Sequence, residues 1–309
     1  MMTGRYPRLS AEQLVRKLEA PQGKVSMVLD TDTFNEIDDQ FAVIYTLLSP
    51  EKIELQALYA APFYNELSSG PQDGMEKSYE EIKRILKLMK REEIPVYRGS
   101  KGYMQAADQF VESDAASNLV ERAMAATPDE PLYVVAIGAI TNVASAIVMN
   151  PAIIDRIVVI WLGGHALEWP DTREFNLAQD VYASRTVLDC GVPLVLIPCM
   201  GVASNLRTTL SEVRDYVRPV GAIGAYLYDT YEKSRDDHFA YSRVIWDIAV
   251  IAWLVDPERV PSHLLQSPVL SDDYRWSLDA SRHLIRYVRY IDRDAVFHDL
   301  FTKLANADR

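Results

Sequence analysis

A dense group of acidic side chains lies near the N-terminus of this chain. Residues 27–42 contain five carboxylates and neither Lys nor Arg; the acids are Asp30, Asp32, Glu36, Asp38 and Asp39. Carboxylates this close repel one another and raise one another's pKa unless a cation lies between them. Hard oxygen ligands suit Ca²⁺, with Mg²⁺ as the alternative, better than they suit zinc or copper. The sequence therefore predicts a bound divalent cation.

One more carboxylate lies far along the chain, inside the apolar run 244–254. Asp247 is the only charged residue of that run. An unpaired carboxylate buried among such residues would strongly destabilise the fold, so Asp247 needs a partner. The same cation would serve.

The acidic residues must be held by a strand and the helix that follows it. Residues 24–32 read as a β-strand, and an apolar helix is predicted from about Ile37 to the stop at Ser49-Pro50. Asp30 and Asp32 are two residues apart, so they leave the same face at the carboxyl end of the strand, where ligand sites of open α/β sheets form. Asp38 and Asp39 begin the helix, whose dipole stabilises anions there. Capping alone would explain any one of these residues but explains the whole set poorly.

Short apolar runs alternate with amphipathic segments along most of the chain, which is typical of a mostly parallel sheet flanked by helices. We predict one α/β domain over residues 1–309, with a Rossmann-like open sheet. Further strands are predicted at 53–61, 131–137, 157–162 and 194–197, and helices at 76–91, 143–149, 242–255 and 293–307. Residues 264–291 are expected to form a β-rich decoration.

Composition limits the partners. The 309 residues carry a formal charge of -12, which argues against binding a nucleic-acid backbone. Two cysteines and the absence of a signal-like or membrane-spanning apolar stretch indicate a cytoplasmic protein without a membrane partner. A small neutral substrate fits this composition better than a nucleic acid does.

The acidic segment resembles a known family. Asp30-Thr31-Asp32, followed by Asp38-Asp39 and an apolar helix, is similar to the N-terminal signature of the calcium-dependent, inosine-uridine preferring nucleoside hydrolases. These N-ribohydrolases cleave nucleosides into ribose and free base. The gap between the two acidic pairs is two residues longer here than is usual in the family and lacks its Pro-Gly turn. The loop beside the substrate is therefore expected to differ.

The resemblance continues in order along the chain. Matching segments are 136–142, 161–164, 174–176 and 246–249, with a weaker match at Asn65. It implies four metal ligands, namely the carboxylates of Asp32, Asp39 and Asp247 and the backbone carbonyl of Ile137. It also implies ribose-binding residues, namely Asp38, Asn65, Glu174 and Asn176. Relatives commonly form homodimers or homotetramers, which is the expectation for this chain.

The chain departs from many relatives beside the last metal ligand, where Trp246 stands in place of a histidine. Tryptophan stacks on a base but cannot protonate it, so the chain resembles the purine-preferring branch of the family. His238 and His165 are candidates for a proton donor or pocket residue. Tyr103 is a candidate second stacking partner, as is Phe110.

The resulting hypothesis is metal-dependent hydrolysis of the N-glycosidic bond of purine ribonucleosides, with Asp32 as general base on a calcium-bound water. One alternative is a nucleoside or ribose binder that has lost turnover. Another is a Mg²⁺-dependent phosphatase of the haloacid dehalogenase type, because residues 29–34 loosely resemble its Asp-x-Asp motif. That class needs a second acidic motif, and residues 271–273 are poorly suited to supply it.

Overall fold

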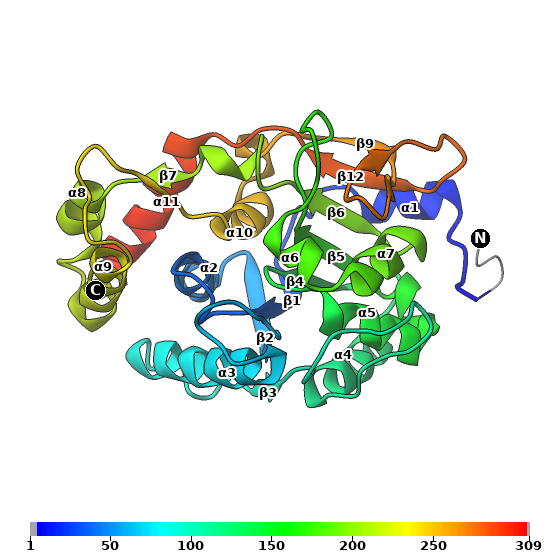
Figure 1. Ribbon diagram of the computed structural model, residues 1–309, viewed down its shortest axis with the longest axis horizontal. Coiled ribbons are helices and arrows are strands. Elements are labelled where there is room, and N and C mark those ends of the chain that lie inside the picture. Colours follow the sequence, from blue (N-terminus) through cyan, green and yellow to red (C-terminus); the bar gives the residue numbers. More distant parts are fainter. Residues whose placement is uncertain (1–4, 308–309) are drawn as a thin grey trace.

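The computed structural model describes residues 5–307, and its centre is an eight-stranded sheet (Figure 1). The strand order is β3-β2-β1-β4-β5-β6-β12-β9, parallel throughout except that β9 runs antiparallel to β12. The strands are β1 (Val25–Thr31), β2 (Ile53–Ala60), β3 (Val96–Arg98), β4 (Leu132–Ala136), β5 (Ile157–Leu162), β6 (Leu194–Ile197), β9 (Ser262–Gln266) and β12 (Leu284–Val288). The predicted single α/β domain with a mostly parallel sheet is confirmed.

Helices cover both faces of this sheet because its strands are apolar on both sides (Figure 1). Met27 and Leu29 of β1 join one core, and Val28 between them joins the other. The first core includes α2 (Asp38–Leu47), α3 (Pro71–Leu88), α9 (Gly221–Lys233), α10 (Ile248–Val255) and α11 (Arg293–Asn306). The second includes α4 (Asp114–Ala125), α5 (Thr141–Met149) and α7 (Val181–Asp189). Shorter helices are α1 (Ala11–Lys17), α6 (Phe175–Gln179) and α8 (Leu210–Glu212).

Three predicted elements differ from the observed ones. Helix α3 begins at Pro71, five residues before its predicted start, with the proline in the first turn where its missing N–H costs nothing. The helix predicted over 242–255 begins only at Ile248, because residues 243–245 are extended. The segment 264–291 is more than a decoration, since β12 pairs with β6 and β9 closes the edge of the main sheet.

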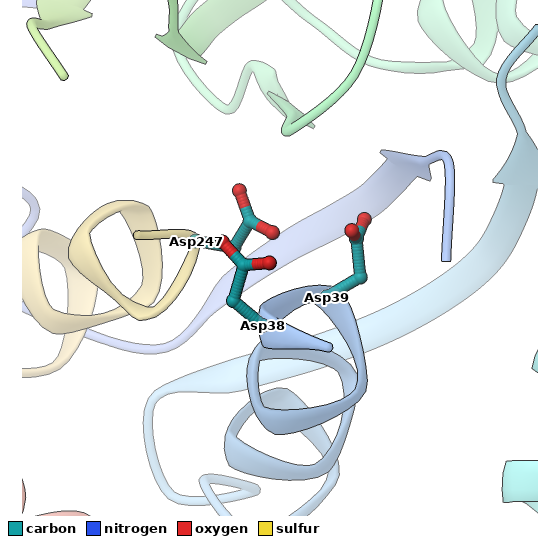
Figure 2. A group of neighbouring side chains, drawn as sticks. All are labelled: Asp38, Asp39 and Asp247. Carbon is teal, nitrogen blue, oxygen red and sulfur yellow. The ribbon is translucent and has the colours of Figure 1, made fainter. Parts of the chain in front are cut away.

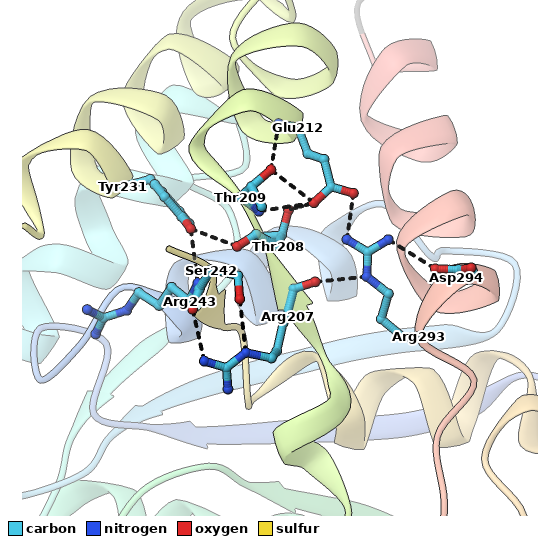
Figure 3. A network of polar contacts seen from close by, with 9 residues as sticks. All are labelled: Arg207, Thr208, Thr209, Glu212, Tyr231, Ser242, Arg243, Arg293 and Asp294. Atoms are coloured by element: carbon cyan, nitrogen blue, oxygen red, sulfur yellow. Dashed lines mark hydrogen bonds and ion pairs between the residues drawn. The ribbon is translucent and has the colours of Figure 1, made fainter. Parts of the chain in front are cut away.

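The extended stretch before α10 is fixed by a polar network around a small two-stranded sheet (Figure 3). Strand β8 (Arg243–Val244) pairs with β7 (Arg207–Thr208), and the Ile245 N–H donates to the Leu206 carbonyl at 2.7 Å. The Tyr231 hydroxyl, from α9, donates to the Thr208 carbonyl at 2.8 Å. Pairing of β8 with β7, supported by α9, therefore determines where the chain enters α10, and with it the position of Asp247.

The strand order places a topological switch point between β1 and β4. Strand β1 continues outward through β2 to β3, whereas β4 continues the other way through β5 and β6. Crevices at the carboxyl ends of such strands are the usual ligand sites of open α/β sheets. Within the described residues, none of the helices has the length and apolar character that crossing a bilayer requires.

Candidate functional site

A cavity of about 240 Å³ opens at this switch point. Its walls come from loops after β1, β4, β5 and β6, from the start of α2, and from the residues just before α10. The lining residues are Asp32, Asn35, Glu36, Asp38, Asp39, Ile137, Leu162, His165, Arg173, Glu174, Phe175, Asn176, Cys199, Met200, Trp246 and Asp247. Most of the residues predicted for the site therefore meet in one cavity.

Three carboxylates from two distant segments converge on its floor (Figure 2). Asp38 and Asp39 begin α2, and Asp247 directly precedes α10. All three are buried, and one oxygen of each lies within 4.8 Å of the others. Asp38 Oδ2 also accepts a hydrogen bond from the Trp246 N–H at 3.1 Å, which ties α2 to the chain entering α10.

Asp32 borders the same cavity from the end of β1. Its side chain is 1% exposed, and neither carboxylate oxygen has a hydrogen-bond partner in the described residues. The backbone of Gly138 lies against it, because a Cβ built on that glycine would be 2.9 Å from Asp32 Oδ1. A buried carboxylate without partners is costly, so Asp32 requires something that the protein itself does not supply.

The electrostatics of the four aspartates agree with this requirement. Burial raises the pKa of Asp32 well above its usual range, and the charges of Asp39 and Asp38 raise it further. Burial and then the charges of Asp38, Asp39 and Asp32 raise the pKa of Asp247. Burial raises the pKa of Asp38, and repulsion from Glu36 is the next largest cause. Burial raises the pKa of Asp39 to about 7. A divalent cation would reverse these shifts, because opposite charge favours the ionised form.

Two neighbours hold the acidic segment in place. Asp39 Oδ1 accepts a hydrogen bond from the Thr31 hydroxyl at 2.5 Å. Asp30 Oδ1 accepts one from Asn142 Nδ2 at 2.7 Å, and Asp30 does not line the cavity. Asp30 is thus part of the support between β1 and α5, whereas Asp32 and Asp39 face the cavity.

The Ile137 carbonyl, predicted as a metal ligand, is oriented by Asn176. Asn176 Nδ2 donates to the Ile137 carbonyl at 3.3 Å and to the Leu162 carbonyl at 3.1 Å, so it spans the ends of β4 and β5. With Asp32, Asp39 and Asp247 this gives an all-oxygen donor set, which fits a hard cation such as Ca²⁺ or Mg²⁺.

Glu174 caps α6 as well as facing the cavity. Its Oε1 accepts from the Asn176 N–H at 2.8 Å, and its Oε2 accepts from the Gly164 and Leu177 N–H groups at 2.9 and 3.0 Å. Burial raises the pKa of Glu174, and these hydrogen bonds oppose that effect. The carboxylate is thereby fixed where the loop 163–174 meets α6.

Two of the predicted aromatic or histidine candidates reach the cavity. Trp246 lines it and packs partly buried against the first core. His165 lines it from the loop after β5, and burial lowers the pKa of its imidazole. The Met200 N–H donates to His165 Nδ1 at 3.4 Å, which leaves Nε2 to carry the proton.

Three predicted site residues do not line the cavity, nor does Phe110. Asn65 Nδ2 donates to Asn35 Oδ1 at 2.7 Å, so Asn65 supports a lining residue. The Tyr103 hydroxyl donates to Gln179. Burial raises the pKa of Tyr103, and the charge of Asp32 raises it further. His238 stacks on Tyr231, with ring centroids 5.7 Å apart, in the segment before β8.

Several lining residues escaped sequence reasoning. Cys199 and Met200 follow β6, and the position of that strand beside β5 would have placed them at the site. Arg173 directly precedes the matched segment 174–176, but the resemblance assigns it no role. Asn35 and Glu36 belong to the lengthened loop, which was expected to differ but not assigned contacts.

Comparison with known proteins agrees with this geometry. Residues 27–297 match the profile of the family described as inosine-uridine preferring nucleoside hydrolase. The pyrimidine-specific ribonucleoside hydrolase RihA of Salmonella paratyphi B is 28% identical over 260 residues, covering 75% of this chain and 80% of the relative.

Solved structures show the same fold. A plant nucleoside hydrolase, PpNRh1, aligns with a TM-score of 0.73 and 19% identity, covering 92% of this chain and 99% of that one. The purine-preferring ribonucleoside hydrolase of Gardnerella vaginalis aligns with a TM-score of 0.74 and 20% identity, covering 91% and 98%. The chain belongs to the inosine-uridine preferring nucleoside hydrolase family, whose members are hydrolases of the N-glycosidic bond of ribonucleosides.

Proposed function

We propose that this chain hydrolyses ribonucleosides with a preference for purine bases, using Ca²⁺ and Asp32 as general base. The observation that carries the proposal is the buried Asp32 carboxylate, which has no hydrogen-bond partner among residues 5–307 and lines a cavity with three further aspartates. Mg²⁺ is the alternative cation.

The cation would be held by the carboxylates of Asp32, Asp39 and Asp247 and by the Ile137 carbonyl. When bound, it supplies Lewis-acid activation of the attacking water and an anchor for the ribose 2′ and 3′ hydroxyls. The orphaned oxygens of Asp32 and the raised pKa of each aspartate support this assignment, because both features are unfavourable unless positive charge lies among them.

The reaction needs a base, a sugar site and stabilisation of positive charge on the sugar. Asp32 accepts a proton from the attacking water. As it does so, the water oxygen bonds to the ribose C1′ and the bond from C1′ to the base nitrogen breaks. Asp38, Glu174 and Asn176 hold the sugar, with Asn65 acting through Asn35. The nearby carboxylates favour the oxocarbenium-like charge that develops.

Trp246 supports the purine preference, since it lines the cavity where many relatives carry a histidine. Its indole ring can stack on a departing purine but cannot protonate it. The similar proteins include both a pyrimidine-specific and a purine-preferring hydrolase, so the assay must compare both kinds of base.

A panel of inosine, guanosine, adenosine, uridine and cytidine tests the proposal, with free base and free ribose measured in Ca²⁺ and in chelator. We expect purine kcat/KM to exceed pyrimidine kcat/KM about tenfold or more, consistent with one stacking contact. Chelation should abolish turnover. Equal turnover in chelator would contradict the role of the cation, and faster cleavage of uridine would contradict the purine preference.

The same panel separates the alternatives. A ribose binder would show heat of binding in calorimetry but release no base. A phosphatase would release phosphate from a generic phosphomonoester; the structure disfavours it, because Asp272 and Asp273 lie exposed in the turn between β10 (Val269–Leu270) and β11 (Trp276–Ser277).

Location and assembly complete the proposal. Cys190 and Cys199 are both free and buried, which suits a reducing cytoplasm. We also propose a homodimer or homotetramer, as the resemblance implies, to be checked by light scattering on the purified protein.

A further inference from the structure

We propose that the sugar end of the cavity binds a phosphate at the ribose 5′ position, so that nucleoside 5′-monophosphates are substrates. This inference rests on the proposed function and names a substrate class for the same site. Its central residue is Arg173, the one arginine or lysine among the described residues that line the cavity, six of which are carboxylates.

Arg173 is not neutralised by the protein. Within residues 5–307, no carboxylate oxygen lies within 4.0 Å of its guanidinium, and its side chain donates no hydrogen bond. Arg243, which approaches the cavity residue Glu36, differs because it pairs with Glu36 at 2.7 Å. The Arg173 guanidinium keeps all its donors for a ligand.

The guanidinium is also held in position. It lies 4.3 Å from the ring centroid of Tyr274, which is a cation–π arrangement. Tyr274 has φ of 58°, a left-handed conformation uncommon for a tyrosine, and its carbonyl accepts a hydrogen bond from the Thr172 N–H at 2.7 Å. Trp276 Nε1 donates to the His165 carbonyl at 2.8 Å. The hairpin formed by β10 and β11 thus fixes both ends of the loop 165–173.

In the binding mode proposed above, the 5′ position of a nucleoside lies beside this loop. The acidic end of the cavity takes the 2′ and 3′ hydroxyls, and Trp246 takes the base. Glu174, the residue after Arg173, holds the sugar, so the remaining ribose substituent is the one on C5′. His165 lies on the same loop, and its Nε2 can donate a second hydrogen bond.

A phosphate monoester is the group that this pair fits best. Arginine binds phosphate through two parallel N–H donors, and a single arginine with one histidine suits a single phosphate. The carboxylates that line the cavity, Glu174 among them, would repel a phosphate, so the phosphate needs a cationic side chain beside it, and Arg173 supplies one.

The reaction itself is unchanged by the phosphate. Water oxygen bonds to C1′, the bond from C1′ to the base nitrogen breaks, and its electron pair leaves with the base, which takes up a proton. The phosphate ester stays intact, so the products are ribose 5-phosphate and free base.

The test compares inosine with inosine 5′-monophosphate in the presence of Ca²⁺, measuring hypoxanthine and inorganic phosphate separately. The wild type should release hypoxanthine from the nucleotide with a kcat/KM about tenfold above that for inosine, and without free phosphate. Arg173→Gln should lower the nucleotide-to-nucleoside ratio of kcat/KM roughly tenfold to a hundredfold, the usual range for one charge-assisted hydrogen-bonded pair. Arg173→Lys, which keeps the charge, should recover part of the ratio.

Arg218→Gln is the matched control. Arg218 is also exposed and also lies over a tyrosine ring, 4.6 Å from the centroid of Tyr228, but it does not line the cavity. Its substitution should leave the ratio unchanged. In the wild type, ribose 5-phosphate should inhibit inosine hydrolysis more strongly than ribose does, a comparison that needs no variant.

The outcomes are distinguishable. Cleavage of inosine but not of its monophosphate, or an Arg173→Gln ratio within twofold of the wild type, overturns the inference and leaves the proposed function standing. If neither compound nor any other nucleoside releases base, the proposed function itself fails. Should Arg173→Gln not fold, the lysine variant and the inhibition comparison decide.

Discussion

Asp39→Asn should raise the free energy of unfolding in the absence of calcium. In the presence of calcium, the variant should gain much less stability than the wild type does. Burial raises the pKa of Asp39 from 3.8 to about 7, a difference of about 3 units. At 1.36 kcal/mol per unit, ionising Asp39 in the folded protein costs about 4 kcal/mol at pH 8. Asparagine removes this cost and can still accept the Thr31 hydroxyl hydrogen bond through its carbonyl oxygen.

The sign of the pH dependence follows from the same shift. The folded protein holds the Asp39 proton more tightly than the unfolded chain does, so in chelator the free energy of unfolding of the wild type falls as pH rises from about 4 to about 7. In the variant, the part of this fall in the free energy of unfolding that comes from Asp39 should be absent. Calcium at a hundred times its dissociation constant should add about 2.7 kcal/mol to the wild type and much less to the variant.

Urea unfolding followed by tryptophan fluorescence, at pH 5 and pH 8 with calcium or chelator, measures these differences. Asp30→Asn is the matched control, since burial also raises the pKa of Asp30 to about 7 but Asp30 does not line the cavity. It should stabilise the protein with and without calcium alike. The reasoning is refuted if Asp39→Asn is destabilised in chelator at pH 8, or if it gains as much from calcium as the wild type does.

Three further substitutions address the chemistry. Asp32→Asn should lower kcat by roughly 10²–10⁴, the range for losing a general base, while circular dichroism shows a folded protein; near-normal kcat would exclude Asp32 as the base. Trp246→Ala should lower kcat/KM for inosine by roughly fivefold to a hundredfold and affect uridine less, whereas equal losses would reject base stacking. Gly138→Ala places a Cβ 2.9 Å from Asp32 Oδ1 and should cost about a hundredfold in kcat through displacement of that carboxylate, so an unchanged kcat would show that the contact is unimportant.

The sequence predicted the acidic site well because local rules govern it. Strand alternation and the start of a helix place Asp32, Asp38 and Asp39 near one sheet edge, and the burial of Asp247 demanded a partner there. The structure brings these residues to one cavity. Their binding of a cation stays a prediction.

Features that depend on tertiary contacts were not predictable in the same way. A helix was predicted from residue 242, but pairing of β8 with β7 keeps residues 243–245 extended. Strand β12 pairs in parallel with β6, and the paired residues Arg286 and Val195 are 91 positions apart in the sequence, a contact that no local pattern specifies. Arg173 looks like an ordinary surface charge until the β10–β11 hairpin is seen to hold it at the cavity.

The side-chain amide of Asn176 would couple cation binding to sugar binding if both occur as proposed. It donates to the Ile137 carbonyl, whose second lone pair would be available to the proposed cation, and it is also proposed to contact the sugar. A sugar that draws this amide toward itself would weaken its hydrogen bond to the carbonyl and leave more electron density on that oxygen for the cation. Linkage is reciprocal, so an occupied sugar position and calcium should each tighten the other's dissociation constant by the same factor.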